Sequence, residues 1–206
     1  MTNNKKEIMS AITHLCGVIF GVIGMIVLVY NSLKTESFIQ LVSFIVFGIS
    51  MILLYTASTV YHITDSSKEY KKLLRKIDHM MIFVLIAGTY TPICLIVLKG
   101  AIGHNLLIAI WVFAIIGIFL KVFWIEAPRK LVSSIYIIMG WLAVFALSPI
   151  INNMDIGGVF WLVLGGIIYT IGGVIYGTKK PNIATKWFGF HEIFHLFVLG
   201  GSVCHF

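Results

Sequence analysis

Residues 191–206 of the chain read HEIFHLFVLGGSVCHF, an apolar stretch that carries two histidines four residues apart. Such a stretch is typical of a membrane-spanning helix, in which ionisable side chains are costly and usually functional. On a helix, His191 and His195 would project from one face. The stretch also matches the pattern His-Glu-x-x-His, in which two histidines bind a metal and Glu192 would serve as a general base. Because that pattern is short, we favour the alternative that Glu192 extends to the membrane surface.

The rest of the chain has the same apolar character. Of its 206 residues, 59% are hydrophobic and 11% are charged, and the mean hydropathy is +1.00. A soluble domain has about a quarter of its residues charged. We therefore predict an all-α integral membrane protein, a single domain over residues 1–206 that crosses the cell membrane several times. Because a span needs about 20 apolar residues, the sequence predicts a bundle of seven transmembrane helices at roughly 8–30, 38–62, 78–98, 105–124, 131–151, 156–177 and 187–206.

The basic residues predict the orientation of these spans. Of the 15 Lys and Arg residues, Lys34 and Lys99 alone fall in connections on one side of the membrane, and all others lie on the other side. Because Lys and Arg concentrate in cytoplasmic connections, we expect a cytoplasmic N-terminus and a C-terminus outside. This topology accounts for the net charge of +7 without a nucleic-acid partner. It is also the opposite of the topology of G-protein-coupled receptors.

The predicted topology brings ionisable side chains from four spans to one level near the cytoplasmic face: His14, His62, Asp78, His191 and His195. A histidine within a span can be a hydrogen-bonded packing residue, and the residues alone leave that alternative open. Three imidazoles with one open position are also an arrangement that holds a catalytic zinc. Asp78 could then hold a water molecule or orient an imidazole. Ser58, one turn deeper than His62, could donate a hydrogen bond to an oxygen that develops negative charge.

Four short motifs together carry a resemblance to a known family. They are Thr13-His14, Ser58-x-x-x-His62, Asp78-His79 followed by GTYTP at 88–92, and His191-x-x-x-His195. The chain resembles the hemolysin III family, the bacterial branch of the progestin and adipoQ receptor superfamily. The resemblance implies a Zn²⁺ ion bound by His62, His191 and His195, with Asp78 reaching the metal through water and Ser58 beside it. Around this centre we expect Thr13, His14, His79 and Glu192.

The resemblance extends to adiponectin receptors and alkaline ceramidases, which implies hydrolysis of a lipid amide. We therefore expect a zinc-dependent intramembrane hydrolase of a lipid amide or ester at the cytoplasmic leaflet, with Ser58 and Asp78 in catalytic roles and a part in membrane lipid homeostasis. One alternative is a hemolysin-type pore or channel with a structural zinc. The outer halves of the spans are almost devoid of charge, which disfavours a wide single-chain pore and leaves a homo-oligomeric one. A second alternative is a ligand-sensing membrane receptor or regulator.

Overall fold

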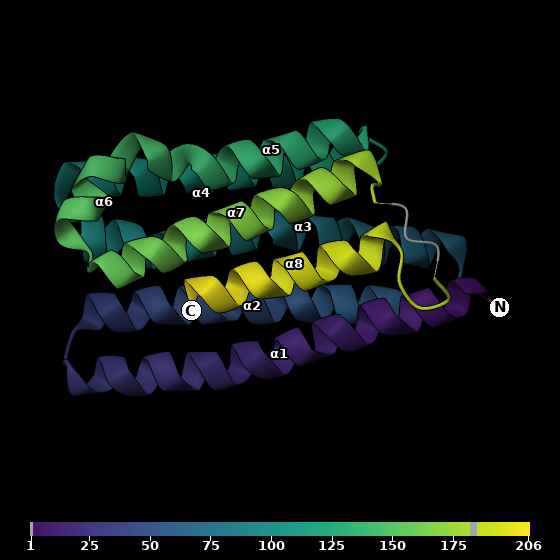
Figure 1. The fold of residues 1–206 in the computed structure, drawn as a ribbon, viewed down its shortest axis with the longest axis horizontal. Helices are drawn as coiled ribbons and strands as arrows, with labels where there is room; N and C mark the ends of the chain where they lie inside the picture. Colours follow the sequence, from purple (N-terminus) through teal and green to yellow (C-terminus); the bar gives the residue numbers. More distant parts are fainter. Residues whose placement is uncertain (1, 182–184) are drawn as a thin grey trace.

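The structure is a computed structural model that describes residues 2–181 and 185–206, and all regular structure within these ranges is helical (Figure 1). The α-helices are α1 (Thr2–Lys34), α2 (Phe38–Ile63), α3 (Lys68–Pro92), α4 (Gly100–Phe123), α5 (Arg129–Trp141), α6 (Leu147–Asn153), α7 (Ile156–Thr178) and α8 (Phe190–His205). A π-helical segment, Ile93–Leu98, extends α3. A 3₁₀ segment, Leu142–Ala146, joins α5 to α6, so that Arg129–Asn153 forms one continuous span.

Six helical segments are long and apolar enough to cross a membrane, and α8, with 16 residues, completes the bundle. Large apolar side chains point away from the bundle. On α4, for example, Ile108 is 62% exposed and Phe123 is 82% exposed. Lipid is the solvent that such a surface requires, because monomeric soluble proteins rarely expose large contiguous apolar patches. The predicted seven-helix integral membrane bundle is confirmed.

The first and last helices of the chain are neighbours. Helices α1, α2 and α3 pack in sequence order, α3 packs on α4, and α5 packs on α7. The last helix, α8, packs on α7 and α1, and Figure 1 shows it running beside α2. The N-terminal end of α8 therefore lies at the same end of the bundle as the start of α1 and the end of α2. We call this the cytoplasmic end, following the charge distribution.

Helices α3 and α1 begin furthest ahead of the starts that the apolar pattern predicts. Helix α3 starts at Lys68, ten positions before the predicted span, because the Ser67 hydroxyl caps it by accepting a hydrogen bond from the Tyr70 amide at 3.3 Å. Ser, Thr, Asp and Asn are favoured at this position because they satisfy a free N–H of the first turn. Helix α1 starts at Thr2 and not near residue 8. Polar residues expected in flanking segments, including Lys6 and Glu7, are thus held on helices.

Glycines allow α7 and α8 to approach closely. A Cβ atom at Gly201 of α8 would lie 2.7 Å from the Tyr169 ring, and one at Gly172 of α7 would lie 2.8 Å from the side chain of Phe197. Close packing on small residues is a general way in which membrane helices associate. The last turn of α8 lies in the outer half of the bundle, where the Phe206 ring covers Gly24 of α1. This packing fixes α8, and with it two of the histidines, against the rest of the bundle.

Candidate metal centre

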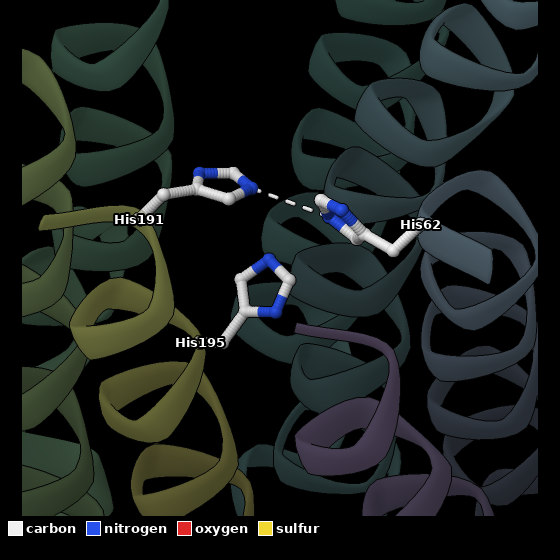
Figure 2. A group of neighbouring side chains, drawn as sticks. All are labelled: His62, His191 and His195. Carbon is white, nitrogen blue, oxygen red and sulfur yellow. Dashed lines mark hydrogen bonds between the residues drawn. The ribbon is translucent and has the colours of Figure 1, made fainter. Parts of the chain in front are cut away.

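Three histidines converge at the cytoplasmic end of the bundle (Figure 2). His62 comes from the last turn of α2, and His191 and His195 come from the first turns of α8. One ring nitrogen from each residue lies within 4.8 Å of the others, and the Nε2 atoms of His62 and His191 are 3.2 Å apart. Two ligands of one tetrahedral zinc are separated by roughly 3.3 Å, given Zn–N bonds of about 2.0–2.1 Å. The pair His62 and His191 has this separation, and the three imidazoles together could hold a metal ion.

Two groups on α1 orient two of these imidazoles, those of His62 and His195. Glu7 Oε2 lies 2.9 Å from His62 Nδ1, and the backbone carbonyl of Ser10 lies 3.4 Å from His195 Nδ1. When each Nδ1–H donates to its oxygen, the Nε2 lone pair is left free to face the centre. Metal-binding histidines are commonly held in this way by a carboxylate or a carbonyl. Sequence reasoning missed Glu7 and Ser10, because the first span was expected to begin at residue 8 and serine is unremarkable within it.

Asp78 lies beside the histidines but is not a member of the three-nitrogen group. Its side chain is buried on α3 and lines a cavity of about 20 Å³, which we call the junction cavity, together with His14, His191 and His195. A volume of about 10–15 Å³ is enough to hold one water molecule. The junction cavity thus has room for the water through which Asp78 is expected to act.

Ser58 is buried on α2, and within the described ranges its hydroxyl has no hydrogen-bond partner. Buried polar groups are normally hydrogen-bonded, so an orphaned hydroxyl calls for an explanation. Ser58 lies one turn deeper than His62, as the sequence predicts for a residue that donates a hydrogen bond to a substrate oxygen. A hydroxyl without a protein partner is free to serve such a ligand.

His14 and Thr13 lie behind His195. The His14 ring stacks on the His195 ring with centroids 3.6 Å apart and planes 12° from parallel, and it meets the Tyr55 ring edge-on. Both His14 nitrogens are buried without a partner in the described part of the chain. The Thr13 hydroxyl donates to the Ser10 carbonyl at 2.9 Å, the same oxygen that faces His195. Stacking places the His14 ring beside a ligand and not among the ligands.

His79 lines both the junction cavity and the polar cavity at the cytoplasmic end, but it is not one of the three clustered histidines. Its Nδ1 lies 2.6 Å from the Arg75 carbonyl and its Nε2 lies 2.9 Å from the Tyr176 hydroxyl. Both ring nitrogens thus have protein partners, and no lone pair is left for a metal. His79 Nδ1 is also 3.9 Å from Asp78 Oδ2. Its geometry connects α3 to α7 and supports Asp78 from the side.

Glu192 does not extend to the membrane surface, and that interpretation was wrong. Its side chain is buried, and Oε2 accepts a hydrogen bond of 2.6 Å from the Gly189 amide that precedes α8. Oε1 accepts a second one, of 3.1 Å, from the Ser10 hydroxyl. A carboxylate at the third position of a helix satisfies free N–H groups and complements the helix dipole. Glu192 therefore caps α8 and ties it to α1, with both oxygens engaged.

Cavities of opposite character adjoin the histidines. Towards the cytoplasmic end lies a polar cavity of about 570 Å³, the cytoplasmic vestibule, whose lining includes His62, His191 and the basic residues Lys6, Arg75, Lys121 and Arg129. Deeper in the bundle lies an apolar cavity of about 100 Å³, lined by side chains such as Leu85 and Tyr169. The junction cavity shares His191 with the vestibule, and it shares Leu54, Ile82 and Val198 with the apolar cavity.

Comparison with known proteins shows the family of the chain. A family model described as Haemolysin-III related matches residues 2–206. The chain is 41% identical over 202 residues to the Hemolysin-3 homolog of Bacillus subtilis, covering 98% of this chain and 92% of that protein. It has the same identity to Hemolysin-3 of Bacillus cereus, covering 98% and 89%. It is 27% identical over 168 residues to the human monocyte to macrophage differentiation factor, covering 78% and 66%. The chain therefore belongs to the haemolysin III-related family of multi-pass membrane proteins.

Proposed function

We propose that the chain is a zinc-dependent intramembrane hydrolase that cleaves a lipid amide or ester at the cytoplasmic leaflet and so contributes to membrane lipid homeostasis. The observation that carries the proposal is the position of the histidines between a polar and an apolar cavity. A lipid placed across this boundary has its head in the vestibule and a chain in the apolar cavity. Its amide or ester linkage then lies at the level of His191 and His195.

The residues present have the chemistry that such a reaction requires. His62, His191 and His195 would hold Zn²⁺, which as a Lewis acid polarises a carbonyl group and activates water. The Asp78 carboxylate faces the junction cavity, where it would orient the attacking water and accept its proton. The free Ser58 hydroxyl would donate to the carbonyl oxygen as negative charge develops there.

The same geometry favours hydrolysis over a pore through one chain. A pore needs polar groups along a path through both leaflets. Beyond the histidines the space is lined mainly by apolar side chains, and Met51, Leu54 and Phe83 are at most 1% exposed. The vestibule therefore adjoins apolar space and not a polar channel.

The first test is the metal content of detergent-purified protein by plasma mass spectrometry. We expect about one zinc per chain in the wild type, and a loss of that zinc in His191→Ala and in His195→Ala. His104, on α4 and outside the cluster, supplies the control, because His104→Ala should retain the metal. Protein without stoichiometric metal, purified in the absence of chelator, would contradict the proposal.

The second test is a screen of lipid amides and esters with wild-type protein in liposomes. Release of a fatty acid should require His191 and stop on addition of a zinc chelator. Ion flux that persists in His191→Ala liposomes, without any lipid cleavage by the wild type, would favour a pore.

A further inference from the structure

Lys121 is a largely buried cation that forms no direct ion pair among the described residues. It lies in the last turn of α4, is 3% exposed, and lines the cytoplasmic vestibule. Among the described residues, no carboxylate oxygen lies within 4.0 Å of its ammonium group. Burying an ammonium without a partner is costly. An anion bound in the vestibule would remove that cost.

Arg129 presents a second cation to the same cavity. Its guanidinium group lies 5.6 Å from the centre of the Tyr176 ring and 5.5 Å from that of Phe190. These cation–π contacts hold the group in place without using its N–H donors. In the described part of the chain Arg129 also forms no ion pair. A fixed guanidinium with free donors suits the paired oxygens of a phosphate.

The carboxylates of the vestibule are already occupied elsewhere. Glu7 lies 2.9 Å from His62 and 3.8 Å from Lys71, and Glu126 accepts a hydrogen bond of 2.6 Å from Arg75. Glu192 is held by Ser10 and the Gly189 amide. Three cations of the vestibule, Lys6, Lys121 and Arg129, therefore have no carboxylate oxygen within 4.0 Å among the described residues. More than one unpaired cation suits a dianionic phosphate group better than a single carboxylate, and Lys121 and Arg129 are the two that burial and aromatic contacts hold in place.

From this charge balance we infer that the cytoplasmic vestibule binds the phosphate of an anionic lipid headgroup, with Lys121 and Arg129 as its ligands. The vestibule shares His62 and His191 with the candidate metal centre, so a phosphate held there places the rest of the lipid at the histidines. A volume of about 570 Å³ accommodates a headgroup. The identity of the lipid as a substrate rests on the proposed function, whereas the phosphate site itself does not.

The test measures lipid binding without requiring turnover. Full-length protein in a neutral detergent is titrated with dioctanoyl phosphatidic acid or with dioctanoylglycerol, and the bound lipid is counted by native mass spectrometry. The two lipids share their acyl chains and differ only in the phosphate. We expect the wild type to bind phosphatidic acid roughly 10- to 30-fold more tightly. Inorganic phosphate should compete, but only at far higher concentration, because it lacks the acyl chains.

Matched variants locate the site. Lys121→Met and Arg129→Gln should each lower the affinity for phosphatidic acid towards that for dioctanoylglycerol. Lys130→Met removes one charge from the adjacent, exposed position and should change nothing. Lys121→Met should melt no lower than the wild type, since it removes an unpaired buried charge. If it nevertheless fails to fold, Arg129→Gln, at an exposed position, carries the test.

Three results would overturn the inference. They are equal affinity of the wild type for the two lipids, a preference that survives in both vestibule variants, and an equal loss of preference in Lys130→Met. If inorganic phosphate binds tightly and phosphatidic acid does not, the ligand of the site is free phosphate and not a lipid headgroup. A protein that binds phosphatidic acid as expected but releases no fatty acid from any lipid would contradict the proposed function and leave the phosphate site standing. Cleavage of neutral lipids without any preference for a phosphate group would contradict the phosphate site and leave the proposed function standing.

Discussion

Glu7 Oε2 lies 2.9 Å from His62 Nδ1, so a carboxylate on the first helix holds a histidine on the second. Loss of a carboxylate that orients a metal-bound histidine typically weakens metal affinity by roughly 10- to 100-fold. We expect Glu7→Gln to lower zinc affinity by this amount, measured by competition with a chromophoric chelator. Glu69→Gln, at an exposed position on α3, is the control. An unchanged affinity in Glu7→Gln would mean that His62 is oriented without it.

Substitution of Ser58 should affect catalysis without lowering stability. Its hydroxyl is buried without a protein partner in the described residues, so Ser58→Ala should leave the melting temperature unchanged or raise it. If the hydroxyl stabilises negative charge on the substrate oxygen, the same change should lower kcat by about 10²- to 10³-fold. Zinc content should stay at the wild-type level, because Ser58 is not a ligand. A variant with normal turnover would remove Ser58 from the proposed reaction.

Gly88 of α3 lies directly against Ser50 of α2. A Cβ atom there would lie 2.1 Å from Ser50 Oγ, and Ser50 is fixed by a hydrogen bond of 2.7 Å to the Phe47 carbonyl. Gly88→Ala should therefore lower the free energy of unfolding by about 1–3 kcal/mol. Gly166→Ala is the matched control, since its Cβ would meet no atom within 4 Å. Equal unfolding free energies for the two variants in detergent would show that the bundle relaxes around Gly88.

Tyr55 joins three helices through one hydroxyl network. Its hydroxyl donates to Ser202 Oγ at 2.6 Å, and the Tyr169 hydroxyl lies 2.8 Å from the same oxygen. Tyr55→Phe should lower the free energy of unfolding by about 0.5–1.5 kcal/mol, because one buried hydrogen bond is lost while Ser202 Oγ keeps its contact with Tyr169. The His14 ring rests against Tyr55. The zinc affinity of Tyr55→Phe, measured together with its unfolding free energy, would therefore show whether Tyr55 also positions the histidines. Tyr30→Phe, at an exposed position, should match the wild type in both measurements.

Much of the candidate site could be predicted because membrane depth follows from topology. Once the spans and their orientation are assigned, His62, His191 and His195 must share a level, and the structure brings their nitrogens within 4.8 Å of one another. Depth says nothing about direction around a helix axis. His14 and His79 lie at the same level, yet one ring stacks on His195 and the other points to Tyr176.

The supporting groups could not be predicted for a different reason. Ser10 acts through its carbonyl oxygen, which every residue possesses, so its identity carries no signal. Glu7 lies outside the apolar run, where hydropathy alone predicts no helix. Glu192 was expected at the membrane surface because a lone carboxylate avoids lipid. Its burial depends on Ser10 and the Gly189 amide, two partners that only the packing of α8 on α1 reveals.

The three clustered histidines are split between the second span and the seventh, and 129 positions separate His62 from His191. During synthesis α8 emerges after every other span, so six inserted helices would display a single histidine of the three. Metal binding would then coincide with the packing of α8 between α1 and α7. It would stabilise only a chain whose insertion is complete. The zinc content of purified protein would therefore report on membrane insertion, because only a molecule whose last helix is inserted and packed would hold the metal.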